Sequence, residues 1–86
     1  MYYTYILYSK SLGKYYVGYT HDLNLRLERH NSSWGKFSSR GIPWNLMYYE
    51  SFENKSDAIK RENEIKRKKD RLYIERLISH AEGRPG

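Results

Sequence analysis

Two tyrosine-rich segments near the start of the chain limit the fold most strongly. Residues 2–8 read YYTYILY and residues 14–19 read KYYVGY, and both are rich in residues typical of strands. The short turn between them ends in Gly13, so the two segments predict an antiparallel hairpin. The chain has 86 residues and no cysteine, which excludes disulfides, a thiol nucleophile and a Cys-based zinc site. A chain of this length predicts a thin core.

The rest of the chain predicts helices and one further strand. The predicted elements are a helix from an N-cap at Thr20 to about His30, a loop over 31–43, a strand over 44–52, a helix over about 55–69 and a helix over 71–79 capped by Asp70. The order ββαβαα predicts an α+β fold with a small three-stranded antiparallel sheet flanked by helices. We expect a single domain over residues 1–80 and a flexible tail over 81–86.

The charge of the chain favours a polyanionic partner. Sixteen Lys and Arg against ten Asp and Glu give a formal net charge of +6 and a pI near 9.6, which is typical of nucleic-acid binding. The basic segments lack the apolar face of a membrane-surface helix, and no apolar stretch approaches 18 residues. We therefore expect a soluble cytoplasmic protein that does not bind membranes.

A carboxylate lies inside the apolar stripe of the helix predicted over 55–69. With about 100° of rotation per residue, Glu62 falls between Ala58 and Ile65 on the face that should meet the sheet. A buried carboxylate needs a cation, a metal or several hydrogen-bond donors. The alternative is that Glu62 lies at the rim of the core and turns toward solvent or a lysine.

The helix that precedes the loop places two polar residues beside its leucine stripe. Arg26 and His30 are four residues apart and lie at the edge of the buried face. An arginine there can bind a phosphate, and a histidine can exchange a proton near neutral pH. An ordinary exposed helix border explains the same pattern.

The run KRENEIKRKKDR is strongly basic. It offers phosphate contacts or a solvated helix face, and the candidate nucleic-acid ligands are Lys60, Arg61, Lys66, Arg67 and Lys69.

The faces of the strands raise a problem for the tyrosines of the hairpin. If Leu7 and Val17 both face the core, Tyr5 and Tyr16 lie on opposite faces unless a bulge or the twist near Gly18 brings them together. In the third strand, simple alternation predicts one face that carries Trp44, Leu46, Tyr48 and Phe52.

These residues together resemble the GIY-YIG nuclease domain, in particular its small stand-alone bacterial members. The segment YTY with Tyr5 and the segment YVG with Tyr16 stand for the two tripeptides, with ten residues between the two tyrosines. Arg26, His30 and Glu62 match further family positions, and the resemblance covers about residues 2–78. The first tripeptide lacks the usual Gly and Ile. No asparagine stands beyond the glutamate helix, where many active members have one.

The resemblance implies a metal-dependent endonuclease that hydrolyses phosphodiester bonds in DNA, including branched or damaged DNA. One divalent ion, Mg²⁺ or Mn²⁺, would be held by Glu62 and water. Arg26 would offset charge in the transition state, while Tyr5 or Tyr16 would activate the attacking water with help from His30. We also expect a monomer, and a protein partner that supplies substrate specificity.

Two other functions fit the same residues. A non-catalytic nucleic-acid-binding module would use strand aromatics to stack bases and the basic helix to hold phosphates. A protein-docking domain would use Trp34 and Trp44 as surface anchors.

Overall fold

The hairpin, the third strand and the helices form close to where the sequence predicts them, apart from the start of the first helix. The computed structural model describes residues 1–32, 40–68 and 70–80. Its elements in chain order are β1 (Tyr2–Ser9), β2 (Lys14–Thr20), α1 (Leu23–His30), β3 (Trp44–Phe52), α3 (Lys55–Lys68) and α4 (Arg71–Ser79). The order ββαβαα confirms the predicted α+β class. The predicted tail, residues 81–86, lies outside the described residues.

β1 is the central strand of the antiparallel sheet, whose strand order in the described part of the chain is β2-β1-β3. Gly13 closes the β1–β2 hairpin with φ 63°, a left-handed conformation that glycine adopts without the steric cost of a Cβ. The register pairs Ile6 with Val17 and Leu7 with Tyr16. Directly paired residues point to the same face of a sheet, so this register decides which side chains meet.

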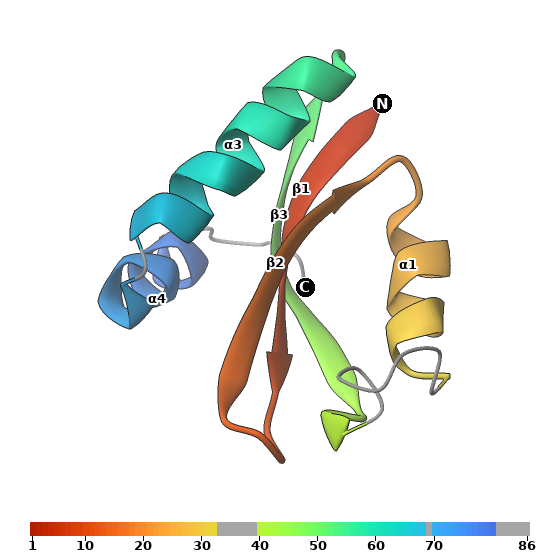
Figure 1. The fold of residues 1–86 in the computed structure, drawn as a ribbon, viewed down its shortest axis with the longest axis vertical. Helices are drawn as coiled ribbons and strands as arrows, with labels where there is room; N and C mark the ends of the chain where they lie inside the picture. Colours follow the sequence, from red (N-terminus) through yellow and green to blue (C-terminus); the bar gives the residue numbers. More distant parts are fainter. Residues whose placement is uncertain (33–39, 69, 81–86) are drawn as a thin grey trace.

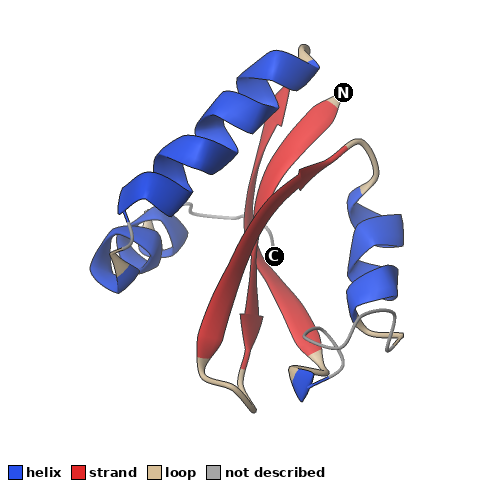
Figure 2. Cartoon of the chain, viewed as in Figure 1, coloured by secondary structure: helices blue, strands red, loops and turns tan. Residues whose placement is uncertain are grey.

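Helices cover both faces of the sheet, so its strands bury side chains on both sides. α3 and α4 lie on one side and α1 on the other (Figure 1, Figure 2). The cluster on the α3 and α4 side is built on Ile6, Val17, Tyr48 and Ile65. The cluster on the α1 side is built on Tyr5, Leu7 and Trp44, with Leu23 and Leu27 of α1 packed against it. The thin core expected from the chain length is therefore two small clusters that share one sheet.

A bulge in β3 overturns the predicted face of that strand. Ile6 pairs with Tyr48 but the next residue, Leu7, pairs with Leu46, so Met47 is the extra residue on β3. The bulge reverses the alternation, and Tyr48 joins the α3 side while Leu46 packs on the α1 side. The predicted common face was wrong because simple alternation assumes an uninterrupted ladder.

The start of α1 also differs from the prediction. Asp22, not Thr20, is the N-cap, and its side chain accepts a hydrogen bond from the backbone N–H of Leu25 at 3.0 Å. Thr20 is the last residue of β2, and its hydroxyl accepts from the N–H of Asp22 at 3.1 Å. Thr20 therefore shapes the turn between β2 and α1 rather than the first helical turn.

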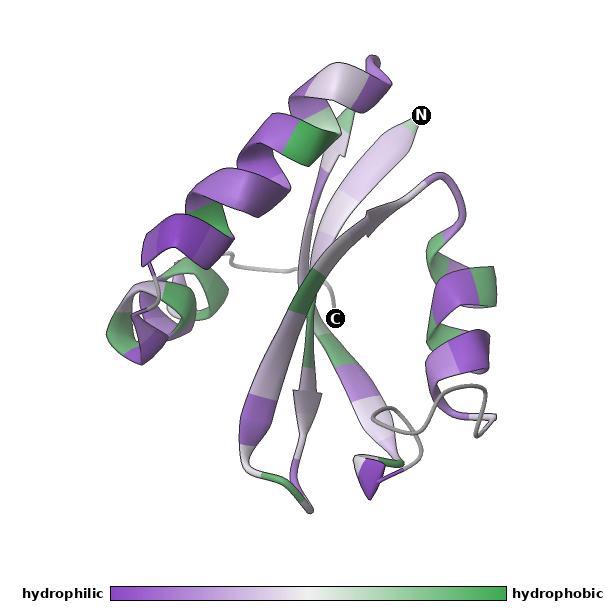
Figure 3. Cartoon of the chain, in the orientation of Figure 1, coloured by the Kyte–Doolittle hydropathy of each residue, from purple (hydrophilic) through white to green (hydrophobic). Residues whose placement is uncertain are grey.

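Side-chain hydrogen bonds hold α3 and α4 in place. The Thr4 hydroxyl in β1 donates to the Ala58 carbonyl of α3 at 2.7 Å. Asp70 caps α4 as predicted, because its carboxylate accepts from the Leu72 N–H at 3.0 Å. Figure 3 shows that α3 is mostly hydrophilic, with few apolar positions along it.

Within the described ranges, no helix has both the length and the apolar character needed to cross a membrane.

Candidate active site

Tyr5 and Tyr16 lie on the same face of the sheet, contrary to the expectation from alternation. Leu7 pairs with Tyr16, so both side chains share the α1 side with Tyr5, while Val17 faces α3. The two tyrosine rings are stacked, with centroids 6.3 Å apart and an interplanar angle of 24°. The expectation was wrong because it placed Leu7 and Val17 in one core, whereas the sheet is buried on both faces.

Gly18 makes room for the Tyr5 ring. Gly18 is the β2 partner of Tyr5, and a Cβ built on it would lie 2.6 Å from the Tyr5 hydroxyl oxygen and 2.8 Å from its Cζ. No ordinary Cβ contact is that short, so any other residue at this position would displace Tyr5. The absence of a side chain lets the Tyr5 ring pass over β2 toward the open edge of the sheet.

A cavity of about 590 Å³ lies where the Tyr5 ring meets this edge. Its lining residues come from β1, β2, α1 and α3, together with the turn after β2. They are Tyr2, Tyr5, Tyr16, Gly18, Tyr19, Thr20, His21, Arg26, Lys55 and Glu62. Four of the five residues predicted as catalytic therefore line one cavity, although α1 and α3 belong to opposite sides of the sheet.

Glu62 both faces the site and pairs with a lysine, the two possibilities that the sequence left open. Its side chain is 13% exposed and lines the cavity beside Tyr5 and Arg26. One of its oxygens, Oε2, lies 2.6 Å from the ammonium nitrogen of Lys66, which is one helical turn further along α3. A lysine therefore pairs with the carboxylate, as the rim alternative predicted, and the carboxylate also faces the pocket.

His30 lies behind the two tyrosines and is 7% exposed. Its ring centroid is 4.6 Å from that of Tyr16 and 6.0 Å from that of Trp44, and its Nε2 lies 3.4 Å from the Tyr5 hydroxyl. Burial, and then the positive charge of Arg26, lower the pKa of His30 below its usual value. The imidazole is therefore mainly neutral at pH 7 and can accept a hydrogen bond from Tyr5.

Burial raises the pKa of the Tyr5 hydroxyl well above its ordinary value of about 10. The neighbouring Tyr16 and the Glu62 carboxylate act in the same direction, while the guanidinium of Arg26 opposes them. Tyr5 is therefore a neutral hydrogen-bond donor over the physiological pH range.

The residues of the pocket fit a hard divalent ion that keeps most of its water. Mg²⁺ and Mn²⁺ prefer oxygen ligands, and Mg²⁺ commonly binds through one or two carboxylates, water and substrate phosphates. Glu62 supplies one carboxylate, which pairs with the ammonium group of Lys66. The phenols of Tyr5 and Tyr16 line the same cavity. In the part of the chain that the structure describes, no group of three or more acidic, His or Cys side chains forms a complete protein cage. Glu62 is therefore the candidate ligand.

The predicted phosphate ligands differ in their exposure and in their ion-pair partners. Lys60 and Arg67 are exposed, Lys66 pairs with Glu62, and Lys69 lies outside the described residues. Arg61 is only 19% exposed, and its guanidinium pairs with Glu50 and Glu64.

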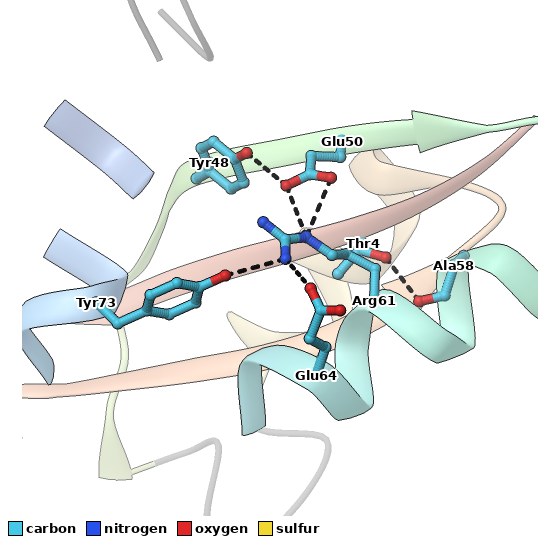
Figure 4. A network of polar contacts seen from close by, with 7 residues as sticks. All are labelled: Thr4, Tyr48, Glu50, Ala58, Arg61, Glu64 and Tyr73. Atoms are coloured by element: carbon cyan, nitrogen blue, oxygen red, sulfur yellow. Dashed lines mark hydrogen bonds and ion pairs between the residues drawn. The ribbon is translucent and has the colours of Figure 1, made fainter. Parts of the chain in front are cut away.

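Arg61 joins three elements instead of facing solvent (Figure 4). Its Nε donates to Glu50 of β3 at 3.0 Å, and one of its terminal nitrogens donates to the Tyr73 hydroxyl of α4 at 3.0 Å. The Tyr48 hydroxyl donates to the same Glu50 carboxylate. This geometry supports a structural role for Arg61 in place of the expected phosphate contact.

Lys55, which is not among the residues predicted from the sequence, lines the cavity together with Glu62. The two residues are seven positions apart, two helical turns that return to nearly the same face, and this spacing could have revealed Lys55.

The docking alternative placed anchors at Trp34 and Trp44. Trp44 is 1% exposed and belongs to the core, and Trp34 lies outside the described residues.

The fold and the pocket define the class of this protein. A three-stranded α+β domain presents a stacked tyrosine pair, an arginine from the first helix and a glutamate from the long helix around one cavity. The family model described as the GIY-YIG catalytic domain matches residues 1–74, so the chain belongs to the GIY-YIG family. The family is generally one of endonucleases that act on DNA and typically depend on a divalent metal.

Similar proteins carry the family name UPF0213. The UPF0213 proteins of Staphylococcus aureus strains Mu3 and N315 are each 46% identical to this chain, over 74% of this chain and 84% of theirs. The solution NMR structure of a UPF0213 protein from Bacillus halodurans is 36% identical, with a TM-score of 0.60 over 98% of this chain and 89% of that one. The chain therefore shares the fold of the small single-domain UPF0213 proteins. The names of these relatives state no activity.

Proposed function

We propose that the protein is a divalent-metal-dependent endonuclease that hydrolyses phosphodiester bonds in DNA. The observation that carries this proposal is the shared cavity, to which Tyr5, Tyr16, Arg26 and Glu62 contribute from four different elements. β2 is an edge strand of the described sheet, so a nucleic-acid backbone can approach the cavity from the side. Membership of a nuclease family and the net charge of +6 support the same function.

Arg26 and Glu62 have different roles at the scissile phosphate. The planar guanidinium of Arg26 binds two phosphate oxygens and offsets the negative charge that grows in the transition state. Glu62 holds the divalent ion, which when bound supplies Lewis-acid polarisation of the phosphate. Both side chains are partly buried, and partial exclusion of water strengthens the charge interactions.

The two tyrosines have different tasks. Tyr16 is half-buried and can reach solvent, so its hydroxyl orients the attacking water. Tyr5 is 1% exposed, and its raised pKa keeps it a neutral donor to the substrate or to His30. His30 acts through Tyr5, since its neutral ring accepts a hydrogen bond from the phenolic O–H and so sets the orientation of the hydroxyl.

Cleavage of labelled DNA in the presence of Mn²⁺ tests the proposal. Single-stranded, duplex, flap and junction substrates cover the alternatives for substrate structure. We expect the wild type to cut at least one of them, and Glu62→Gln and Arg26→Ala to lower the rate by about 100-fold or more. Far-ultraviolet circular dichroism should show that both variants stay folded.

Glu53→Gln is a matched control, because Glu53 is an exposed glutamate just before α3. It should cleave as the wild type does. Equal cleavage by the wild type and Glu62→Gln would indicate a contaminating nuclease and would overturn the proposal.

The non-catalytic binding module is the second candidate. The exposed cations Lys60 and Arg67 on α3 can contact phosphates whether or not the pocket is active. Tight, salt-dependent DNA binding without cleavage on any substrate would favour that function.

A further inference from the structure

The cavity is larger than the chemistry of one phosphate requires. A volume of about 590 Å³ belongs to the size class that accommodates a ligand of many atoms. The proposed reaction uses one part of the wall, made by Tyr5, Tyr16, Arg26 and Glu62. The rest of the wall is made by the ends of β1 and β2, the turn after β2 and the first turn of α3.

Lys55 is the cation in this second part of the wall. It lies seven residues before Glu62 on α3, which is nearly the same helix face and about 10 Å along the helix axis. The flexible stem of a lysine covers several ångströms, so its ammonium group can serve a ligand group next to one held at Glu62 and Arg26.

Among the cations of α3 that have no carboxylate partner within the described residues, Lys55 is the one that lines the cavity. Arg61 pairs with Glu50, Lys66 with Glu62 and Arg71 with Glu75. Lys55 is exposed, and no ion pair or hydrogen bond engages its side chain within the described residues. Because Lys66 already balances the charge of Glu62, Arg26 and Lys55 leave the cavity with a positive charge.

We propose that Lys55 forms a second phosphate subsite, which binds the backbone phosphate next to the scissile one. The ligand class is a nucleic-acid strand with at least two consecutive phosphates. The inference rests on the proposed function and extends it, because it assigns a role to the part of the cavity that the reaction does not use. The second phosphate holds the strand in register, so that the scissile phosphate meets Arg26 and Glu62.

A combination of protein and substrate variants tests the subsite. The substrate is a short DNA oligonucleotide with a mapped cleavage site, in which a neutral methylphosphonate replaces the phosphate on the 5′ or the 3′ side of that site. The proteins are the wild type, Lys55→Met, Lys55→Arg and Lys10→Met. Lys10 is a matched control, because it is an exposed lysine in the β1–β2 turn, far from the start of α3 (Figure 1).

We expect Lys55→Met to raise KM for the all-phosphate substrate by about tenfold, with kcat within twofold, and to lower the slope of log affinity against log salt by about 1. Lys55→Arg should restore most of the loss, and Lys10→Met should resemble the wild type. At one of the two positions, the methylphosphonate should raise KM of the wild type about tenfold and that of Lys55→Met less than twofold.

Two outcomes overturn the inference and are distinct from each other. If the wild type cleaves but Lys55→Met and Lys10→Met have the same KM, only the second subsite is excluded. The same holds if both methylphosphonates change the KM of the wild type and of Lys55→Met equally. If the wild type cleaves no substrate with Mn²⁺, the proposed function fails and this inference fails with it.

Discussion

At the scale of single residues, the site depends on which side chain is absent as much as on which are present. Gly18 has no Cβ, and the space that a Cβ would fill holds the hydroxyl end of Tyr5. The tripeptide YVG of β2 therefore supplies Tyr16 and, through Gly18, also leaves space for Tyr5 of the neighbouring strand. The ion pair between Glu62 and Lys66 also bears on the reaction, because it engages the carboxylate that is the proposed metal ligand.

The pair of Lys66 and Glu62 should weaken metal binding. In the variant Lys66→Met the carboxylate loses its competing cation, so Mn²⁺ affinity should rise by up to about fivefold, the size expected of a partly exposed ion pair. Electron paramagnetic resonance of free Mn²⁺ during a titration measures this affinity.

Lys60→Met is the matched control, since Lys60 is an exposed lysine of the same helix and its loss removes the same charge. Its Mn²⁺ affinity should stay close to that of the wild type. Weaker Mn²⁺ binding by Lys66→Met would show instead that the lysine holds the carboxylate in the orientation that the ion needs.

At the scale of elements, the join between α1 and β3 supports the site from behind. Asn31 follows α1, and its side chain accepts from the Trp44 N–H at 2.6 Å and donates to the Trp44 carbonyl at 3.0 Å. These two bonds fix the start of β3 beside the end of α1. Trp44 in turn lies against His30 and Tyr16, so the link holds the ring cluster under the cavity.

The variant Asn31→Ala should lower the free energy of unfolding by about 2 kcal/mol. It leaves two backbone groups of the buried Trp44 without these partners, and unsatisfied buried groups carry this order of cost. Urea unfolding followed by tryptophan fluorescence measures the change. Asn24→Ala removes an exposed amide from α1 and should cost far less; equal losses would mean that the link does not stabilise the join.

At the scale of the whole molecule, the pocket exists because two layers meet at one strand edge. α1 brings Arg26 from one side of the sheet and α3 brings Glu62 from the other, with β2 between them. The network around Arg61 ties α3 and α4 to β3 on the α3 side (Figure 4). The helix that carries Glu62 is thus held by contacts of Arg61, a residue outside the cavity lining.

Stability of the whole molecule should fall at high pH. Burial, followed by the hydrogen bond to Glu50, raises the pKa of Tyr48 to about 12, and burial also raises the pKa of Tyr5 and of Tyr15. Between the unfolded value of about 10 and the folded value, the folded protein binds more protons, so stability decreases as pH rises. Denaturant unfolding at pH 9 to 12 should show this decrease, and Tyr48→Phe should make it shallower. An unchanged pH dependence in Tyr48→Phe would contradict the assignment.

Much of the fold and part of the site could be predicted from local sequence patterns. Alternation and turn residues predicted the hairpin, Asp70 predicted the start of α4, and helical rotation placed Glu62 toward the sheet. The family resemblance then grouped Tyr5, Tyr16, Arg26 and Glu62, which line one cavity, and His30, which lies behind it. Arg61 could not be assigned in this way, because its acidic and tyrosine partners lie on three different elements.

The order of the elements and their approximate ends follow from the sequence alone, because they depend on neighbours along the chain. The residue types that can bind a phosphate or a metal are likewise read directly from the sequence. Three features required the folded molecule: Tyr5 and Tyr16 share a face, Met47 reverses the alternation of β3, and Lys55 lines the pocket. The physical reason is that alternation sets faces within one strand, whereas the register between strands and the packing of helices on both faces set which residues meet.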